Sequence, residues 1–364
     1  MPQLPADLSA GIGCVGAGFI MADCHLVAYR EHGLHPVAIT SARPVNAERV
    51  AQRHRIQSVC SSVDTLVMHP DVRFLDIAVP PDQQANVIQK VLESDNVLQG
   101  ILAQKPLGRN YAEALQIVQA CEQAGVVLAV NQNMRWDHSV RGCATLLQRQ
   151  ALGEPVLATI DMRAIPHWMP WQKRQGWVTL RIMSIHHLDT FRYWLGTPKR
   201  IFASVRPDPR TEFDHNDGIA LYILEYENGV RASSCDDVWA GPAREGAAAD
   251  IGINWRLEGT EGIATGTIGW PDYPTRTPST LRYSTTSDHG QWHEPKWEAA
   301  WFPDAFIGPM ADLMLAVEED RPPLCSGREN LETMALVDAA YLSAAQHRAV
   351  DVQEIIDAAE PGNS

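Results

Sequence analysis

The sequence lacks any run of about 18 consecutive apolar residues, so it offers no segment long enough to cross a membrane as a helix. Its N-terminal segment, MPQLPADLSAG, lacks the basic and apolar stretches of a secretory signal, and we therefore expect a cytoplasmic location. Basic residues are scarce: 30 Lys and Arg stand against 44 Asp and Glu, a formal net charge of −14. Without a basic stripe, this excess of negative charge argues against a nucleic-acid partner.

Paired cysteines and metal-binding spacings are also missing. The cysteines number seven, an odd count, and show no CxxC spacing. This is typical of reduced, mostly buried thiols in a cytosolic protein rather than of disulfides or a zinc cage. No HExxH pattern occurs, and His289 and His293 lie four apart in a segment with the pattern of a loop. We therefore expect no metal site.

Tryptophan is absent from the first 135 residues, and all 11 tryptophans lie from Trp136 onward. Such a change in composition marks a candidate domain boundary in the 130s. A chain of 364 residues has room for about two domains, and a hydrophobic content of 45% is ordinary for a soluble globular protein. We predict one domain at residues 1–134 and a second at residues 135–364.

In the predicted first domain, short apolar segments alternate with segments of helical character. The apolar segments are almost wholly hydrophobic, which is typical of strands in a parallel sheet covered on both faces. We therefore predict an α/β domain with a doubly wound parallel sheet. The expected strands are residues 10–15, 36–40, 74–79, 100–103 and 126–130, and the expected helices are residues 19–31, 47–54, 83–92 and 111–124.

After residue 135 the strands follow one another with few helices between them, and turns contain glycine, as in Glu227-Asn228-Gly229. This pattern predicts an α+β domain with an antiparallel or mixed sheet. The last dozen residues are polar, and we expect them to be loose. The expected strands are residues 156–163, 201–206, 218–226, 230–235, 254–258 and 262–267, and the expected helices are residues 186–195, 304–319 and 330–348.

The first expected strand runs into Gly16-Ala17-Gly18-Phe19-Ile20-Met21, which matches a GxGxxG fingerprint except at Met21. In that fingerprint the first glycine permits a tight turn and the second lets the backbone approach a pyrophosphate at a helix start. An ordinary strand-to-helix turn is the alternative. The turn opens an alternating β/α domain, which favours dinucleotide binding, and we take Gly16, Gly18, Phe19 and Ile20 as candidate cofactor-binding residues.

The end of the second expected strand bears on the choice between NAD and NADP. This position commonly carries an acid that binds the ribose 2′-hydroxyl of NAD. Here the residues are Thr40-Ser41-Ala42-Arg43, without an acid. Arg43 would attract a 2′-phosphate, which tilts the prediction towards NADP, although Arg43 as a solvated loop residue and an NAD enzyme without the acid are both open. Ser41 and Arg43 are candidate cofactor-binding residues.

Several short motifs, taken in order, resemble those of the Gfo/Idh/MocA oxidoreductases, the relatives of glucose–fructose oxidoreductase and inositol dehydrogenase. The resemblance covers nearly the whole chain. It implies a second domain with a large open, mostly antiparallel sheet, and the reversible oxidation of a hydroxyl on a sugar or cyclitol. The motifs are the Gly16–Met21 turn, Val79-Pro80-Pro81, Lys105-Pro106, Asn133-Met134-Arg135, His186-His187-Leu188-Asp189 and residues 339–344.

The resemblance places Lys105 near the nicotinamide and the reacting hydroxyl. A lysine partly removed from water has a lowered pKa and can accept a proton near neutral pH; a surface lysine at a strand end is the alternative. The family mostly has Glu where this chain has Gln104, and often a His where alignment on Pro80 gives Gln84. Val79, Pro80, Gln84, Gln104 and Lys105 are therefore expected at the cofactor.

The resemblance implies a second catalytic group at His186, whose ordinary pKa makes imidazole a natural proton relay. A satisfied structural histidine at the start of an apolar helix is the alternative. In the family an Asp precedes this His by four residues, and here that position is Ile182. Either Lys105 and His186 suffice, or another acid such as Asp189 or Asp137 takes part, or the chemistry has changed.

Residues 163–181 are rich in rings and cations, and the resemblance places this stretch at the border of the substrate pocket. Aromatic faces suit the C–H faces of a sugar ring, and the cations could meet a carboxylate or phosphate. An apolar core with a solvated edge is the alternative. The candidate substrate residues are Asn133, Arg135, Trp168, Trp177, His186 and His187.

We predict a dehydrogenase that uses NAD or NADP to transfer hydride to or from a sugar or polyol, with Lys105 or His186 taking the hydroxyl proton. Two other functions stay open: a glycosidase that uses bound NAD transiently, and a catalytically silent NAD(P) sensor, which Gln104 and Ile182 would favour. The resemblance also implies a homodimer or homotetramer paired through the exposed face of the second sheet.

Overall fold

The computed structural model describes residues 2–95, 97–164, 169–238 and 251–359. The chain forms two compact units, one of Met1–Trp136 with Pro303–Leu331 and the other of Asp137–Phe302 with Glu332–Ser364. The sequence prediction placed the boundary after residue 134 and kept all later residues in the second domain. The structure instead divides the chain after Trp136, and the later segment Pro303–Leu331 packs with the first unit. Among the described residues, no helix is long and apolar enough to span a membrane.

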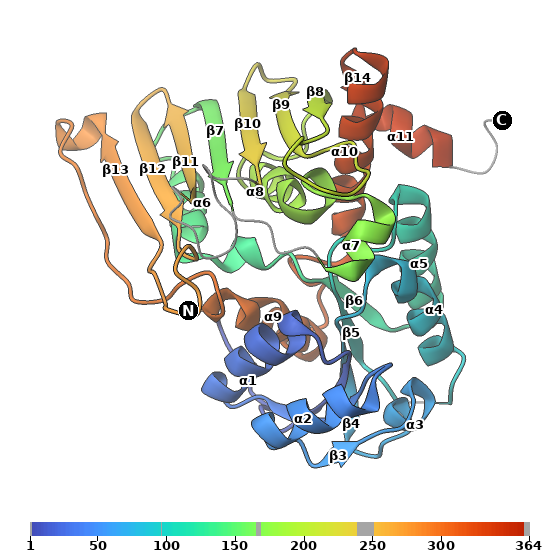
Figure 1. The fold of residues 1–364 in the computed structure, drawn as a ribbon. Coiled ribbons are helices and arrows are strands. Elements are labelled where there is room, and N and C mark those ends of the chain that lie inside the picture. Colours follow the sequence, from blue (N-terminus) through green and yellow to red (C-terminus); the bar gives the residue numbers. More distant parts are fainter. Residues whose placement is uncertain (1, 96, 165–168, 239–250, 360–364) are drawn as a thin grey trace. The chain divides into compact units, whose positions relative to one another are not determined.

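The first unit contains a six-stranded sheet in the order β3-β2-β1-β4-β5-β6 (Figure 1). Every strand pair in it is parallel. All residues of β1 and β5 are buried, as expected of strands covered on both faces. The predicted parallel sheet is confirmed. Its strands are β1 (Gly11–Val15), β2 (His35–Thr40), β3 (Ser58–Val59), β4 (Val72–Ile77), β5 (Gly100–Ala103) and β6 (Val127–Val130).

Helices alternate with these strands. The helix after β1 opens as a π-helical segment, Ile20–His25, and continues as α1, which ends at Gly33 in the left-handed conformation, a common helix C-cap. β3 and α3 are too short to give a periodic pattern and were not predicted. The helices are α1 (Leu26–His32), α2 (Pro44–His54), α3 (Val63–Val67), α4 (Pro81–Leu92), α5 (Tyr111–Gln123) and α9 (Ile307–Glu318).

The α9 helix belongs to the first unit because it packs on β5, β6 and α1. Gly100 in β5 makes this possible, since a Cβ atom there would lie 3.0 Å from a methyl carbon of Leu313. Gly308 in α9 allows an equally close approach, because a Cβ atom there would overlap the indole of Trp136. Close approach of this kind is a common reason for glycine inside a regular element.

The second unit contains an eight-stranded sheet in the order β13-β12-β11-β7-β10-β9-β8-β14 (Figure 1). Among the described pairings within this second sheet, only β7–β10 is parallel, so the predicted mostly antiparallel sheet is confirmed. The strands are β7 (Pro155–Arg163), β8 (Arg200–Arg206), β9 (Ile219–Glu225), β10 (Arg231–Asp237), β11 (Gly252–Gly259), β12 (Gly262–Ile268), β13 (Thr280–Thr285) and β14 (Val350–Asp351).

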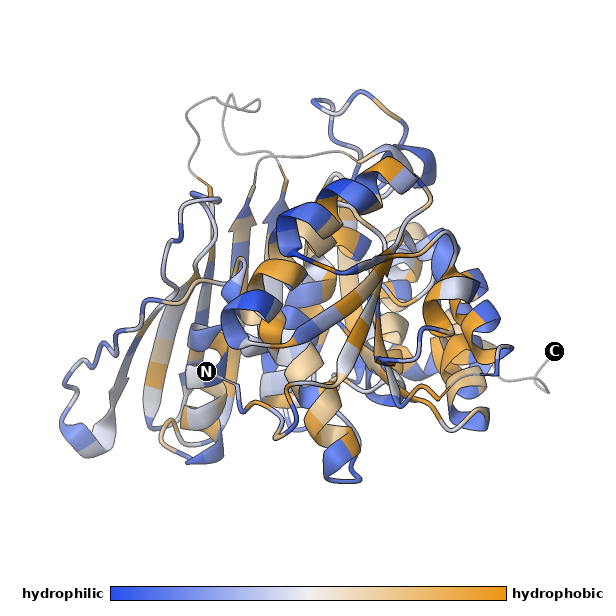
Figure 2. Ribbon diagram, turned by 90° about the horizontal axis from the view of Figure 1, so that it is seen from below, coloured by the Kyte–Doolittle hydropathy of each residue, from blue (hydrophilic) through white to orange (hydrophobic). Residues whose placement is uncertain are grey.

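Burial alternates along most of these strands, with one face covered and the other exposed. The α8 helix packs against β7, and α6 packs against α8, β12 and β13. Figure 2 shows hydrophobic and hydrophilic residues side by side on the same helices. The helices here are α6 (His138–Gln148), α7 (Pro170–Gln175), α8 (Ile185–Leu195), α10 (Gly327–Gln346, which begins in the first unit) and α11 (Val352–Ala359).

The expectation that the last dozen residues are loose is wrong for residues 353–359, which belong to α11. Val352, Ile355 and Ile356 recur at helical spacing, and Val352 is buried. Arg348, which precedes α11, forms an ion pair at 2.6 Å with Glu354 in the first turn of the helix. A short apolar stripe within a polar segment was therefore enough for a helix.

Candidate active site

Most of the predicted cofactor segments follow the carboxyl ends of strands in the parallel sheet. The glycine turn follows β1, Ser41 follows β2, Val79 follows β4 and Lys105 follows β5. Backbone hydrogen bonds continue the ladder past the strand ends, from Gly16 N to Thr40 O at 2.9 Å and from Gln104 N to Ile77 O at 3.0 Å. Strand order reverses between β1 and β4, and ligands bind at such a switch point in doubly wound sheets.

The geometry of the glycine turn fits a dinucleotide. Gly16 has φ +108°, and a Cβ atom there would lie 2.4 Å from the Ala78 carbonyl oxygen. A Cβ atom at Gly18 would meet nothing within 4 Å, so the backbone there is open to an approaching phosphate. Met21, which stands where the fingerprint has its third glycine, is fully buried. Phe19, at 37% exposure, and the half-buried Ile20 begin the following helical segment.

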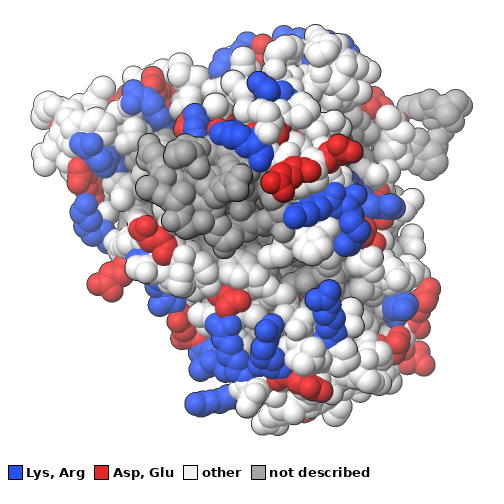
Figure 3. Space-filling model, viewed as in Figure 1, with Lys and Arg blue, Asp and Glu red and all other residues white. Residues whose placement is uncertain are grey.

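Arg43 is exposed and is the residue before the first turn of α2. Ser41 is half-buried, and its hydroxyl accepts a hydrogen bond from Arg43 N at 3.4 Å. Figure 3 shows basic side chains gathered low on the viewed face, in the region that Figure 1 labels α2. Exposed arginines of this region are Arg43, Arg49, Arg53 and Arg55.

Lys105 is held at the end of β5 by two glutamine side chains. Gln84 is fully buried, and its Nε2 donates to Gln104 O at 2.8 Å while its Oε1 accepts from Gly108 N at 3.0 Å. Gln104 Oε1 accepts from Lys105 N at 2.9 Å. Gln84 and Gln104, predicted at the cofactor, thus shape the loop that carries the lysine.

The Lys105 side chain keeps some solvent contact but lies among protein atoms that displace most of its water. This burial lowers the pKa of Lys105 to about 7, because a low-dielectric surrounding disfavours the charged ammonium. A lysine with that pKa is divided between amine and ammonium at neutral pH. It can therefore both accept and donate a proton under physiological conditions.

Asn133 and Arg135 lie in a short 3-10 helix, Asn133–Trp136, just beyond β6. Both side chains are 2% exposed. Arg135 donates to Leu324 O at 3.2 Å and forms an ion pair with Glu329 at 2.8 Å, both in the returning segment of the first unit. Asn133 donates to the amide oxygen of Asn131 at 3.3 Å.

In the second unit, His186 and His187 begin α8 and are both buried. The His186 ring meets Trp301 edge to face, with centroids 5.4 Å apart. The His187 ring points instead to β10, where its Nδ1 lies 3.0 Å from Asp236 Oδ1. Neighbouring residues on one helical turn thus face different surroundings.

Asp236 was not among the predicted site residues, and it is the acid at this helix start. It accepts hydrogen bonds from the Ser184 hydroxyl, from Ser234 Oγ at 2.7 Å and from Tyr222 OH at 3.3 Å. Burial raises the pKa of Asp236, but the charge of His187 and the donated hydrogen bonds outweigh burial and bring that pKa below its ordinary value.

The two acids offered as substitutes for the missing carboxylate at Ile182 are engaged elsewhere. Asp189 accepts from Thr333 Oγ1 at 2.8 Å. Asp137 caps α6, accepting from Ser139 N at 2.8 Å, and also accepts from the Ser279 hydroxyl. These contacts connect elements of the second unit. The sequence held no signal for Asp236, because it lies on strand β10, 49 residues from His187 in helix α8.

Trp177, predicted at the substrate, packs on the guanidinium of Arg181, which lies 5.1 Å from its ring and 4.9 Å from the ring of Tyr341. Arg181 also pairs with Asp338. The start of the π-helical segment Leu180–Ser184 is held by Asp217, which accepts from the backbone N–H groups of residues 178–180 at 2.7–3.1 Å. Trp168 lies outside the described residues.

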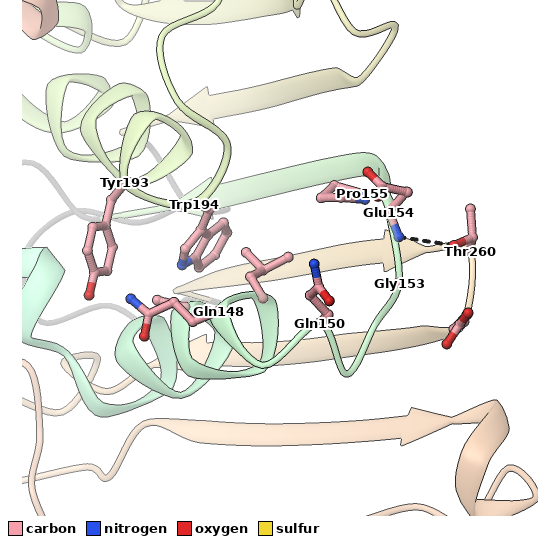
Figure 4. Close-up of a pocket in the computed structure, with 11 residues that line it drawn as sticks. Gln148, Gln150, Gly153, Glu154, Pro155, Tyr193, Trp194 and Thr260 are labelled. Carbon is pink, nitrogen blue, oxygen red and sulfur yellow. Dashed lines mark hydrogen bonds between the residues drawn. The ribbon is translucent and has the colours of Figure 1, made fainter.

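A cavity of about 530 Å³ in the second unit contains none of the predicted site residues. It lies between α6, the end of α8 and the turn into β7 (Figure 4). Glu154 and Thr260 join across this turn through a 3.0 Å hydrogen bond. Among the described residues, no group of three or more His, Cys, Asp or Glu is placed to hold a metal ion.

Comparison with known proteins places both units in one family. The profile described as "Oxidoreductase family, NAD-binding Rossmann fold" matches residues 10–132, and the profile described as "Oxidoreductase family, C-terminal alpha/beta domain" matches residues 144–352. Together these two matches span most of the chain, including the glycine turn, Lys105 and the His186–His187 pair.

Individual relatives are distant but cover nearly the full length. The chain is 25% identical over 361 residues to D-apiose dehydrogenase of Paraburkholderia graminis, covering 94% of this chain and 89% of that protein. Levoglucosan dehydrogenase in complex with NADH has a similar fold, with a TM-score of 0.80 at 20% identity over 94% of this chain and 98% of that one. An oxidoreductase from Agrobacterium radiobacter in complex with NAD+, L-tartaric acid and magnesium gives a TM-score of 0.80 at 20% identity, over 95% and 99%.

Proposed function

Since the chain belongs to the Gfo/Idh/MocA family of NAD-binding oxidoreductases, we propose that it transfers hydride between a nicotinamide cofactor and a CH–OH group of a sugar, cyclitol or other polyol. Relatives named for D-apiose and levoglucosan support this substrate class. The observation that carries the proposal is Lys105, a lysine at the carboxyl edge of the parallel sheet whose pKa burial lowers to about 7.

When bound, the oxidised cofactor supplies the hydride acceptor. The chain supplies the remaining chemistry. Lys105 in its amine form accepts the proton that the substrate hydroxyl loses, and its ammonium form returns that proton in the reverse reaction. His186 is the imidazole that we propose the second unit contributes to proton transfer. Gly16 and Gly18 admit the pyrophosphate, and the Gln84 and Gln104 amides hold the Lys105 loop in place.

A panel of aldoses, polyols and cyclitols assayed at 340 nm with NAD and with NADP tests this proposal. We expect reduction of the cofactor with at least one member. A silent sensor would bind the dinucleotide and turn over none of them. A glycosidase that uses the cofactor transiently would release sugar from a glycoside without net formation of reduced cofactor.

The cofactor preference can be tested at Arg43. If the exposed guanidinium at the end of β2 meets a 2′-phosphate, Arg43→Ala should raise the KM for NADP about tenfold and leave that for NAD within about twofold. Arg49→Ala, at an arginine within α2 that is also exposed, is the matched control and should change neither. Equal KM changes for the two cofactors in Arg43→Ala would contradict this role.

We also propose that the open face of the second sheet pairs two copies of the chain. Phe202 and Ile223 are cross-strand neighbours on this face, and Phe202, Leu221 and Ile223 are 43–47% exposed. Exposed apolar groups that cluster on one face are typical of interfaces. Ile223→Asp should shift the mass measured by light scattering towards the monomer. Val45→Asp, at a 68% exposed site on α2, is the control, and an unchanged mass in Ile223→Asp would exclude this face.

A further inference from the structure

One buried carboxylate binds the backbone of the segment that leads into α8. Asp217 lies just before β9 and is fully buried. Its Oδ1 accepts a hydrogen bond from Val178 N at 3.0 Å, and its Oδ2 accepts from Thr179 N at 3.1 Å and from Leu180 N at 2.7 Å. Backbone N–H groups can only donate, so both oxygens of Asp217 act as acceptors here.

A second acceptor, the carbonyl oxygen of Thr179, connects these residues to the helix. It accepts hydrogen bonds from the backbone N–H groups of residues 182–184 at 2.8–3.1 Å. These residues belong to the π-helical segment Leu180–Ser184, and α8 follows directly, with His186 as its second residue. A shift of the backbone at residues 178–180 would therefore move the turn that carries His186.

Asp217 is itself held from two sides. Tyr341 OH, from α10, donates to Asp217 Oδ2 at 2.7 Å. Burial and the neighbouring Asp217 raise the pKa of Tyr341 well above its ordinary range, so the phenol keeps the proton that it donates. The next residue, Gly218, packs so closely that a Cβ atom on it would lie 2.4 Å from the Cβ atom of Asp208. The acceptor therefore has little freedom to move.

The position of the His186 ring matters because a proton is transferred only within hydrogen-bond reach. The ring meets Trp301 edge to face, with centroids 5.4 Å apart, and both residues belong to the second unit. A misplacement of about 1 Å in a reacting group can cost about 10²-fold in rate. Contacts that hold the start of α8 can therefore affect turnover without touching the substrate.

We propose that Asp217 is a positioning residue that keeps the His186 imidazole in place for proton transfer, and that it acts through the backbone of residues 178–184. The inference rests on the proposed function, which gives His186 its part in proton transfer. Tyr341 donates to the same carboxylate, but its loss leaves the three backbone N–H groups with their acceptor. The two residues should therefore differ in their effect on turnover.

The test uses the full chain with Asp217→Asn, alone and together with His186→Ala. Asparagine keeps the size of the side chain but has one acceptor oxygen, so its amide nitrogen must face at least one backbone N–H. We expect kcat on the best polyol to fall about tenfold, the loss of one buried hydrogen bond, with KM and the Kd for NADH within about twofold. In the His186→Ala background Asp217→Asn should change kcat less than about twofold, because no imidazole is left to position.

Tyr341→Phe is the matched control. It removes a buried hydrogen bond to the same carboxylate, and it keeps the ring that lies 4.9 Å from the guanidinium of Arg181. Its kcat should stay within about twofold of the unaltered value, even though urea unfolding should show a loss of stability similar to that of Asp217→Asn. The control therefore separates the position of the helix start from the loss of a buried contact.

A second measurement needs no turnover. The proton NMR shifts of the His186 ring depend on its position over the neighbouring Trp301, because the indole ring current acts at this distance. Asp217→Asn should shift these His186 signals, and Tyr341→Phe should leave them nearly unchanged.

The inference is overturned by an equal loss of kcat from Asp217→Asn in both backgrounds, by no loss of kcat, or by unchanged His186 signals in Asp217→Asn. His186→Ala alone with an unaltered kcat would instead count against the proposed role of His186, and absence of turnover with every polyol would count against the proposed function. In both of these cases the NMR measurement still decides whether Asp217 positions the ring.

Discussion

Lys105→Met is expected to lower kcat by about 10³-fold, within the range that a positioned proton acceptor contributes. Methionine keeps the length and apolar body of lysine but can neither accept nor donate a proton. The Kd for NADH should stay within a few-fold of the unaltered value, because the proposed phosphate-binding turn with Gly16 and Gly18 follows β1, whereas Lys105 follows β5. Stopped-flow and steady-state assays on the best polyol, with NADH titration by fluorescence, give both quantities.

The proposed role of Lys105 also predicts how the rates of oxidation and reduction change with pH. With a pKa of about 7, Lys105 is mostly ammonium below pH 7 and mostly amine above it. Oxidation needs the amine, so kcat/KM for oxidation should rise as pH increases through about 7. Reduction needs the ammonium and should fall over the same interval. Lys90→Met, an exposed lysine at the end of α4, should keep both the rate and the profile. A pH-independent rate in the unaltered protein would remove Lys105 from the proton step.

Much of the first unit follows from local sequence. Fully buried parallel strands are short apolar runs, and β5 was predicted at its observed bounds, Gly100–Ala103. The glycine turn was predicted because it directly follows such a run. Lys105 was predicted from the family resemblance, and the apolar run shortly before it placed it at the end of a strand. Since carboxyl ends of parallel strands lie on one edge, a correct set of strands was enough to bring these residues to that edge.

The parts that local sequence could not predict depend on contacts between distant residues. The return of α9 to the first unit rests on Gly100 against Leu313 and on Gly308 against Trp136, and neither glycine differs in sequence from an ordinary one. Tyr341 and Asp217, which are hydrogen-bonded, are 124 residues apart. Two-residue strands such as β3 and β14 are too short to show a period. These features become visible only when the chain is folded.

Asp236 is a buried acid at the start of α8, close to the place where Ile182 replaces the acid of the family pattern. The chain lacks the carboxylate four residues before His186, yet the first turn of α8 still faces a buried acid, because β10 supplies one to Ser184 and His187. The acid therefore comes from the sheet rather than from the helix, and it contacts the imidazole next to the one that the family pattern predicts. Its removal would leave several buried polar groups without their acceptor.

Asp236→Ala is accordingly expected to lower the free energy of unfolding by about 3–5 kcal/mol, the usual cost of breaking a buried charged pair. Asp161→Ala is the matched control. Asp161 lies on the neighbouring strand β7, opposite Cys235 of β10, and its ion pair with Arg163 is exposed. Loss of Asp161 should therefore lower the free energy of unfolding by at most about 1 kcal/mol. Urea unfolding followed by tryptophan fluorescence compares the two.

The pH dependence of stability separates the charge of Asp236 from its bulk. Because the pKa of Asp236 is lowered in the folded state from an ordinary value of 3.8, its ionic contribution is present above that value and is lost as pH falls through the folded pKa. The difference between the unaltered protein and Asp236→Ala should therefore shrink in acid. Asp236→Asn keeps the volume and one acceptor oxygen. Its free energy of unfolding at neutral pH should therefore lie between those of the unaltered protein and Asp236→Ala. An equal cost for Asp161→Ala and Asp236→Ala would show that the buried carboxylate does not hold the start of α8.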